Sequence, residues 1–248
     1  MGNMQDSETV TPLYSVIVPA YNEEKLLPAC LAAVNAAMAG VPWPGEVIVV
    51  DNNSRDRTSE VARERGARVV FEPVNQISRA RNAGARAARG RYLLFIDADT
   101  FVSGPLLAAA LDAMHEKGWS GGGAMVTFDR PMNLFYRKLL ELWSAISRSF
   151  SLAAGCFLFC RADAFADTGG FSEKVYASEE IWFSRRLVRW GKQHRMPFRI
   201  ISSPNIETSG RKMESLPRML LVLLTFILCP FAPRFRATSW FWYHRQDS

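Results

Sequence analysis

The sequence predicts an α/β fold: one domain in which a mostly parallel central sheet is flanked by helices. The chain has 248 residues, of which 48% are hydrophobic and 22% charged, which suits one large α/β domain with a sizeable core. From residue 14 to residue 99, short apolar runs alternate with segments of helical pattern. Continuous apolar strands that alternate with helices are typical of a parallel sheet covered on both faces, where ligands bind at the carboxyl ends of the strands.

The first half of the chain contains the most regular elements. YSVIVPA is a β-rich run, and NEEKLLPACLAAVNAAM has the pattern of a helix. Pro28 should lie in the first turn of that helix, because an interior proline would break it. Gly90 stops a later helix. The predicted strands are 14–20, 46–51, 67–73 and 91–99, and the predicted helices are 22–38, 54–65 and 78–90.

The second half is less regular, although strands and helices continue to alternate in it. WSGGGAMVTFD is a glycine-led strand, AAGCFLFCR is another, and ADAFADTGGF has the composition of turns. The predicted elements are a helix at 105–117, a strand at 119–129, a helix at 133–150, a strand at 153–161 and a helix at 179–190.

Composition limits the kinds of partner and site. The net charge of +6 and the pI of about 9.3 favour an anionic partner such as a nucleotide, an acidic lipid or a nucleic acid. The 4 cysteines are too few for a disulfide scaffold and are interpreted as buried free thiols, and the 3 histidines cannot build a zinc site. The first residues lack the apolar stretch of a secretory signal.

Two aspartates follow the apolar run LLFI in the stretch LLFIDADT. If the strand stays extended to its end, the side chains of Asp97 and Asp99 point to the same side, and Ala98 adds no bulk between them. Two carboxylates so close are costly to desolvate unless a cation lies beside them, and divalent cations on phosphate ligands are held by one or two carboxylates. The alternative is an ordinary acidic turn after a strand.

A second acidic stretch, VDNNSRDRT, follows the strand at 46–51. Asp51 closes that strand, where a carboxylate can accept a hydrogen bond from a base N–H or a ribose hydroxyl. Asp56 precedes a helix, and its simpler interpretation is helix capping.

Four stretches in this order and spacing resemble the family 2 glycosyltransferases, which have the Rossmann-like GT-A fold: SVIVPAYNEEKLLPACL, VVDNNSRDRTSEVA, ISRARNAGARAARGRYLLFIDADT and GGF with SEEIWFSRRL. The resemblance covers roughly residues 13–212. It implies a donor-binding half at 13–100, which holds a nucleoside-diphosphate sugar, and an acceptor half at 101–212. Residues 1–12 are expected to be a flexible N-terminus.

The resemblance implies roles for the donor side. Asp51 would contact the base, usually uracil, and Arg79 and Asn82 would lie near the nucleotide. Asp97-Ala98-Asp99 matches the DxD motif, in which Asp99 binds magnesium or manganese directly and Asp97 lies near the ribose and the metal. Residues expected to line the base and ribose are Pro19, Ala20, Tyr21 and Glu23, and those of a loop that closes over the diphosphate are Ser209 and Arg211.

On the acceptor side, the family places a catalytic base in an ED motif after GGF, and the corresponding residues here are Glu179 and Glu180. Glu180 aligns with the usual aspartate and is the predicted base, with Glu179 as its rival. The alternative is two surface acids in the first turn of a helix. Gly155 and Cys156 align with the acceptor-lining stretch. The expected reaction is inverting transfer to a hydroxyl acceptor.

The tail at 213–248 departs from a minimal enzyme. An apolar run at 219–233 is shorter than the roughly 20 residues that a spanning helix needs, and an aromatic and arginine-rich stretch follows it. We expect residues 216–245 to contact a membrane surface, which would place the protein in the cytoplasm, peripheral to the membrane. A tail packed on the core is the alternative.

The hydroxyl acceptor is expected to be a sugar, a polyprenyl phosphate or a lipid, and the last two would fit contact with a membrane surface. No nucleic-acid partner is expected. Two other functions remain open for the whole chain: a non-catalytic binder of sugar nucleotides or other anionic ligands, and a nucleotidyltransferase of similar fold. The second would want a glycine-rich, lysine-bearing loop after the first strand, which VPAYNEEK lacks.

Overall fold

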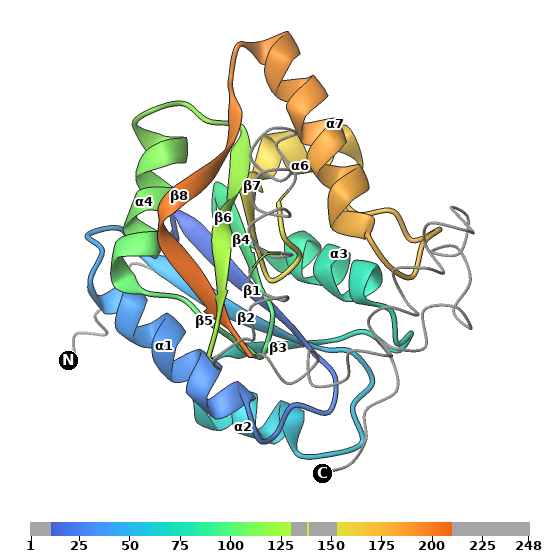
Figure 1. Ribbon diagram of the computed structural model, residues 1–248. Helices are drawn as coiled ribbons and strands as arrows, with labels where there is room; N and C mark the ends of the chain where they lie inside the picture. The colour runs from blue at the N-terminus through green and yellow to red at the C-terminus, as the bar shows by residue number, and fades with distance from the viewer. Residues whose placement is uncertain (1–10, 130–137, 139–152, 210–248) are drawn as a thin grey trace, which may run out of the picture.

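The computed structural model of the chain describes residues 11–129, 138 and 153–209, and these form one α/β unit (Figure 1). Its strands make a single eight-stranded sheet in the order β3-β2-β1-β4-β7-β6-β8-β5. The strands are β1 (Tyr14–Ala20), β2 (Gly45–Asp51), β3 (Arg68–Phe71), β4 (Tyr92–Ile96), β5 (Thr100–Phe101), β6 (Gly121–Phe128), β7 (Phe157–Arg161) and β8 (Phe198–Thr208). The helices are α1 (Leu27–Ala39), α2 (Thr58–Glu64), α3 (Ile77–Ala87), α4 (Gly104–His115), α6 (Ala162–Thr168) and α7 (Glu179–His194).

The sheet is mostly parallel, as the sequence predicted. β1 pairs in parallel with β2 and β4, β2 with β3, and β6 with β8. β7 runs antiparallel between β4 and β6, and β5 is antiparallel to β8. The carboxyl ends of β3, β2, β1 and β4 therefore lie next to one another at one edge of the sheet.

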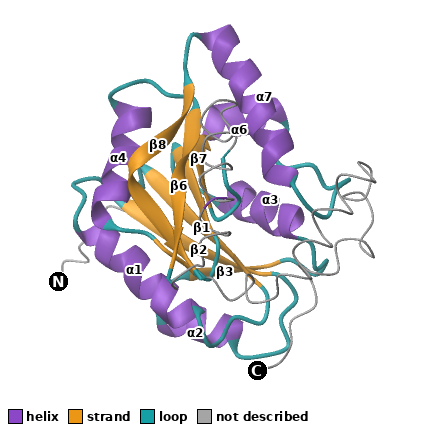
Figure 2. Ribbon diagram, viewed as in Figure 1, coloured by secondary structure: helices purple, strands orange, loops and turns teal. Residues whose placement is uncertain are grey.

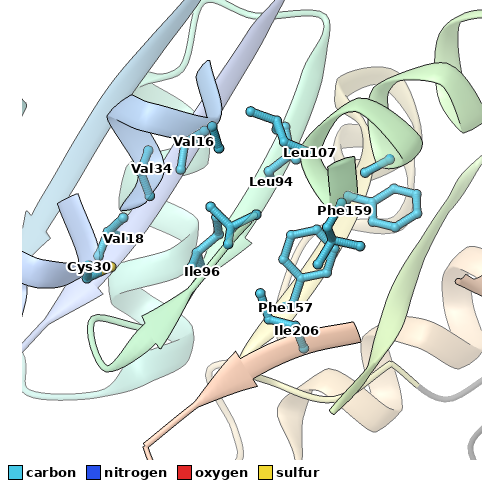
Figure 3. Packing of buried hydrophobic residues seen from close by; sticks show 14 of the residues in the cluster. Val16, Val18, Cys30, Val34, Leu94, Ile96, Leu107, Phe157, Phe159 and Ile206 are labelled. Carbon is cyan, nitrogen blue, oxygen red and sulfur yellow. The ribbon is translucent and has the colours of Figure 1, made fainter. Parts of the chain in front are cut away.

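Helices cover both faces of the sheet, so alternate residues of each strand enter different cores (Figure 2). Val16 and Val18 of β1 pack towards α1 and α4, whereas Ile17 packs towards α3. Figure 3 shows the first of these cores, where Cys30 and Val34 of α1 face β1. Burial on both faces explains why these strands read as continuous apolar runs rather than as alternating ones.

Gly84 lets α3 approach the sheet closely. A Cβ atom at this position would lie 2.4 Å from Cγ2 of Ile17 and 2.9 Å from Cγ2 of Val50. Any larger residue would push the helix away from β1 and β2. The close packing fixes the polar side chains that α3 carries above the strand ends.

Several predicted elements are corrected by the structure. The stretch predicted as turns at 162–171 contains the helix α6, which ends at Gly169 in the left-handed conformation (φ 75°). The strand predicted at 91–99 ends at Ile96. β8 was not predicted, because its alternation is interrupted by polar residues. The predicted helix at 133–150 lies, except for residue 138, outside the described residues.

The described cysteines are free thiols, with Cys30 and Cys160 buried and Cys156 partly exposed, so the prediction of free cysteines is confirmed for these three. None of the helices in the described ranges has the length and hydropathy needed to cross a bilayer. The tail at 213–248 lies outside the described residues.

Candidate active site

Two loops at the carboxyl edge of the sheet are joined by hydrogen bonds. The N–H of Asn52 donates to the carbonyl of Ala20 (2.8 Å), which links the end of β2 to the end of β1. The N–H of Glu23 donates to Oγ1 of Thr58 (2.8 Å). The backbone at 20–24 is thus held against the start of α2. Pro19 and Ala20 are buried at the end of β1, and Tyr21 is partly exposed.

Asp51, the predicted base contact, is buried at the end of β2 and shapes the loop that follows it. Its Oδ1 accepts from the N–H of Ser54 (2.9 Å) and its Oδ2 from the hydroxyl of Ser59 (2.6 Å). Asp56 accepts from the N–H of Thr58 (3.0 Å), the first residue of α2, from one position before the N-cap Arg57.

Asp97, Ala98 and Asp99 form a turn rather than the extended strand end expected from the sequence. The N–H of Thr100 donates to the carbonyl of Asp97 (3.0 Å), which closes a β-turn with Ala98 and Asp99 at its centre. The side chain of Asp97 is 25% exposed, and Asp99 is buried. Burial raises the pKa of the Cys30 thiol to about 12, and the charges of both aspartates add to that shift. Both carboxylates therefore lie close enough to Cys30 for their charges to raise the pKa of its thiol.

Arg81 of α3 connects this turn to the acceptor half of the chain. Its Nη2 donates to Oδ1 of Asp97 (2.9 Å) and to the carbonyl of Gly155 (2.7 Å), and its Nη1 donates to Oε1 of Glu179 (2.5 Å). The side chain is only 3% exposed. Burial alone would lower the pKa of Arg81, but the charges of Asp97 and Glu179 outweigh it and raise that pKa. Arg81 is therefore a fixed cation.

The two glutamates at the start of α7 lie in different surroundings. Glu179 is buried and paired with Arg81. Burial raises the pKa of Glu179, and Arg81 opposes this shift. Glu180 is partly exposed, and a Cβ atom built on Gly155 would lie 3.5 Å from its Cδ. Burial and the neighbouring Glu179 raise the pKa of Glu180 to about 8. Such a carboxyl can take up a proton near neutral pH, as general bases do.

Two other predicted residues, Arg79 and Asn82, bond to residues outside the set that Arg81 joins. The guanidinium of Arg79 pairs with Glu72 (3.3 Å), which follows β3, and with Glu173 (2.9 Å). Asn82 is buried and bonds to the backbone of Phe171 and to the carboxylate of Glu173.

Two predicted residues lie close to the aspartate turn. The N–H of Ser209 donates to the carbonyl of Asp99 (2.9 Å), and the carbonyl of Cys156 accepts from the N–H of Asp97 (3.2 Å). Gly155 adjoins both Arg81 and Glu180. Arg211 lies outside the described residues.

Arg81 was not among the residues predicted for the site, although the sequence carries a signal for it. Ile77, Ala80, Arg81 and Gly84 occur at helical spacing, which puts the arginine on the same stripe as residues that pack against the sheet. A charged residue on a buried stripe needs a partner of opposite charge. That requirement singles out Arg81 rather than Arg79.

Comparison with known proteins identifies the family. Residues 15–165, more than half of the chain, match the model of the family described as glycosyl transferase family 2. The chain belongs to glycosyl transferase family 2. The glycosyltransferase AglE of Haloferax volcanii is 28% identical to this family 2 chain over 194 residues, which are 73% of the chain and 62% of AglE.

Solved structures confirm the GT-A fold. The mannosyltransferase PcManGT from Pyrobaculum calidifontis, in complex with GDP-Man and Mn2+, superposes with a TM-score of 0.63 at 20% identity and covers 92% of this chain and 64% of its own. S. aureus TarS in complex with UDP-GlcNAc gives a TM-score of 0.59 at 22% identity, over 79% of this chain and 58% of its own. This family 2 chain spans less than two thirds of the length of the curated relatives first matched.

The donor set at the aspartate turn suits a divalent cation that also binds phosphate. The charges of Asp97, Glu179 and Glu180 act on Arg81, and those of Asp97 and Asp99 act on Cys156, so acidic groups outnumber the one guanidinium at this centre. Among the described residues, no three or more His, Cys, Asp or Glu side chains are grouped to enclose a metal ion. Magnesium is commonly held by one or two carboxylates together with substrate phosphates, and two aspartates meet that need.

Proposed function

We propose that this family 2 protein transfers a sugar from a nucleoside-diphosphate sugar to a hydroxyl acceptor, with inversion, and that Glu180 is the catalytic base. The observation that carries the proposal is the contrast between the two glutamates. The pKa of both carboxyls is raised, but Glu179 is engaged by Arg81, whereas Glu180 is partly exposed beside the loop that adjoins the aspartate turn. A binding protein would have no use for such a group.

In this mechanism, Glu180 accepts the proton of the acceptor hydroxyl while the hydroxyl oxygen forms a bond to the anomeric carbon of the sugar. The bond between that carbon and the diphosphate oxygen breaks, and its electron pair leaves with the nucleoside diphosphate. Asp97 and Asp99 would hold magnesium or manganese, which neutralises negative charge on the diphosphate when bound. Asp51 and the backbone at 20–24 would receive the base and ribose.

The donor base is proposed to be uracil or guanine. TarS is in complex with UDP-GlcNAc, and PcManGT with GDP-Man, so the fold accepts both bases. The resemblance in the N-terminal half favours uracil. The mycobacterial glucosyl-3-phosphoglycerate synthase, which matches in fold, is in complex with UDP and Mn2+ and supports the same choice.

The experiment is to incubate the protein and its E180Q variant with UDP-glucose, UDP-GlcNAc or GDP-mannose, with and without Mn²⁺. Released nucleoside diphosphate is measured by chromatography, since water can replace the acceptor. We expect the wild type to release it from at least one donor, dependent on Mn²⁺, and E180Q to release it far more slowly. If the protein binds none of the donors and releases nothing, the proposal is wrong.

The acceptor is proposed to be presented at a membrane surface, as a sugar, polyprenyl phosphate or lipid. The support is the arginine- and tryptophan-rich sequence at 216–245, together with similarity to a Drosophila melanogaster dolichyl-phosphate beta-glucosyltransferase (40% identical over 110 residues, 39% of this chain and 33% of that protein). Deleting residues 216–248 should abolish sedimentation with anionic liposomes. Equal sedimentation of both forms would contradict membrane contact.

A further inference from the structure

The guanidinium of Arg81 joins three segments that are far apart in the sequence. It bonds to Asp97 after β4, to the carbonyl of Gly155 before β7, and to Glu179 in the first turn of α7, at 2.9, 2.7 and 2.5 Å. In the proposed function, the Asp97 turn serves the diphosphate, the loop at Gly155 lies on the acceptor side, and the first turn of α7 carries the catalytic base. One buried side chain therefore touches three segments of the proposed reaction centre.

Among the residues that the structure describes, the first turn of α7 has no side-chain cap, although the loop before it is tied to α3 through Gln76. Ser178, the residue before the helix, has a φ of 59°, and its side chain makes no capping bond in the described part of the chain. The first turn carries Glu179 and Glu180, and Glu179 is held by Arg81. Since Glu180 follows Glu179 directly, the bond to Arg81 restricts the backbone from which the Glu180 side chain extends.

The bond from Arg81 to Asp97 restricts the orientation of the Asp97 carboxylate. Its Oδ1 accepts from Arg81, and within the described ranges no hydrogen bond is made to Oδ2. A planar guanidinium fixes the orientation of a carboxylate through directed N–H donors, which a lysine ammonium cannot reproduce at two acids and a carbonyl at once. The bond to Arg81 therefore engages one of the two oxygens of Asp97.

We propose that Arg81 is a positioning residue that sets the placement of the Glu180 carboxyl relative to the Asp97 turn. The inference rests on the proposed function, because it assumes that these two groups act on one substrate. Arg81 itself contacts acidic side chains and a carbonyl, and acts on the reaction through Glu180. Substitution of Arg81 is thus expected to lower turnover much more than it lowers nucleotide affinity.

The test compares R81K with R161K. Arg161 is a matched control, because it is also little exposed (11%) and paired with an acid, Asp163, but lies at the opposite end of β7. We expect R81K to lower kcat for donor hydrolysis by about 10- to 100-fold, the loss that small misplacement of a reacting group produces. The Kd for UDP with Mn²⁺, measured by calorimetry, should change less than about threefold, and R161K should change neither.

A second comparison asks whether Arg81 acts through Glu180. In an E180Q background the base is already absent, so R81K should lower the remaining hydrolysis by less than about threefold. An equal loss in both backgrounds would overturn the proposal. So would a loss of UDP affinity as large as the loss of kcat, because Arg81 would then serve donor binding.

Hydrogen exchange tests the placement without any substrate. R81K should lower amide protection at residues 172–182 by about tenfold or more while α3 and β1 keep theirs, because the bond to α7 is lost locally. The variant E179Q keeps the side-chain shape and should lower amide protection in the same segment. It replaces R81K in this test if R81K does not fold. Unchanged protection in the variants that fold would overturn the proposal. Wild-type inactivity towards every donor would instead refute the proposed function, and the exchange result would still stand.

Discussion

Asn82 and Phe171 are joined by two hydrogen bonds, one in each direction, between α3 and the loop that leads to α7. Nδ2 of Asn82 donates to the carbonyl of Phe171, and Oδ1 accepts from its N–H, both at 2.9 Å. Gln76, one and a half turns earlier, donates to the carbonyls of Glu173 and Val175 at 2.9 Å. α3 is therefore the scaffold that holds the loop before the proposed base.

Substitution of Asn82 by alanine should lower the free energy of unfolding by about 1–3 kcal/mol, because a buried carbonyl and a buried N–H lose their partner. Urea denaturation measures the change. The control is N35A, since Asn35 is exposed and its amide makes one long bond of 3.5 Å, to the carbonyl of Arg65. If both variants are as stable as the wild type, the loop does not depend on Asn82.

The variant E180Q should bind UDP with Mn²⁺ nearly as the wild type does, while its turnover falls on the order of 10²–10⁴-fold, the usual contribution of a general base. The amide keeps the size of the side chain but accepts no proton at neutral pH. Steady-state kinetics and calorimetry separate the two effects. Unchanged turnover in E180Q, with a loss in E179Q, would transfer the role of base to Glu179.

The pH dependence of donor turnover should reflect the raised pKa of Glu180. A base works when deprotonated, and burial raises the pKa of this carboxyl to about 8, so kcat/KM should rise from about pH 6 and level off above pH 8. An exposed glutamate would already be ionised at pH 6, and the profile would be flat there. A flat profile between pH 6 and 8 would therefore argue against a base whose pKa is raised to about 8.

The elements that the sequence predicted correctly are those whose signal is local. β1 and β2 are apolar runs of the observed length, and Pro28 lies at the start of α1 as required by its missing N–H. The seven residues of α6, ADAFADT, are too few to show a helical period, so their composition predicts turns. β8 is a strand because β6 and β5 lie on either side of it, which only the assembled sheet reveals.

The candidate site can be predicted from the sequence only in part, because its geometry depends on contacts between segments that are far apart in the chain. The sequence places Asp97 and Asp99 at the end of a strand, but the turn that presents them depends on the hydrogen bonds of Asp97 with Cys156 and Thr100. Arg79 and Arg81 are alike in composition, and the helical stripe that separates them becomes decisive once α3 is known to pack on the sheet. Glu179 and Glu180 are also alike in sequence and differ through Arg81.

The variant D99A should abolish the dependence of donor binding on Mn²⁺, because a diphosphate and a divalent ion bind together only where a carboxylate holds the ion against them. Calorimetry of UDP with the wild type should show much tighter binding in Mn²⁺ than in EDTA, and D99A should show equally weak binding in both. D112N is the control, since Asp112 pairs with Lys117 on the surface of α4. D97N should retain part of the Mn²⁺ effect, because Arg81 already occupies one oxygen of Asp97. If D99A still binds UDP more tightly with Mn²⁺, the ion is held elsewhere and the role proposed for Asp99 is wrong.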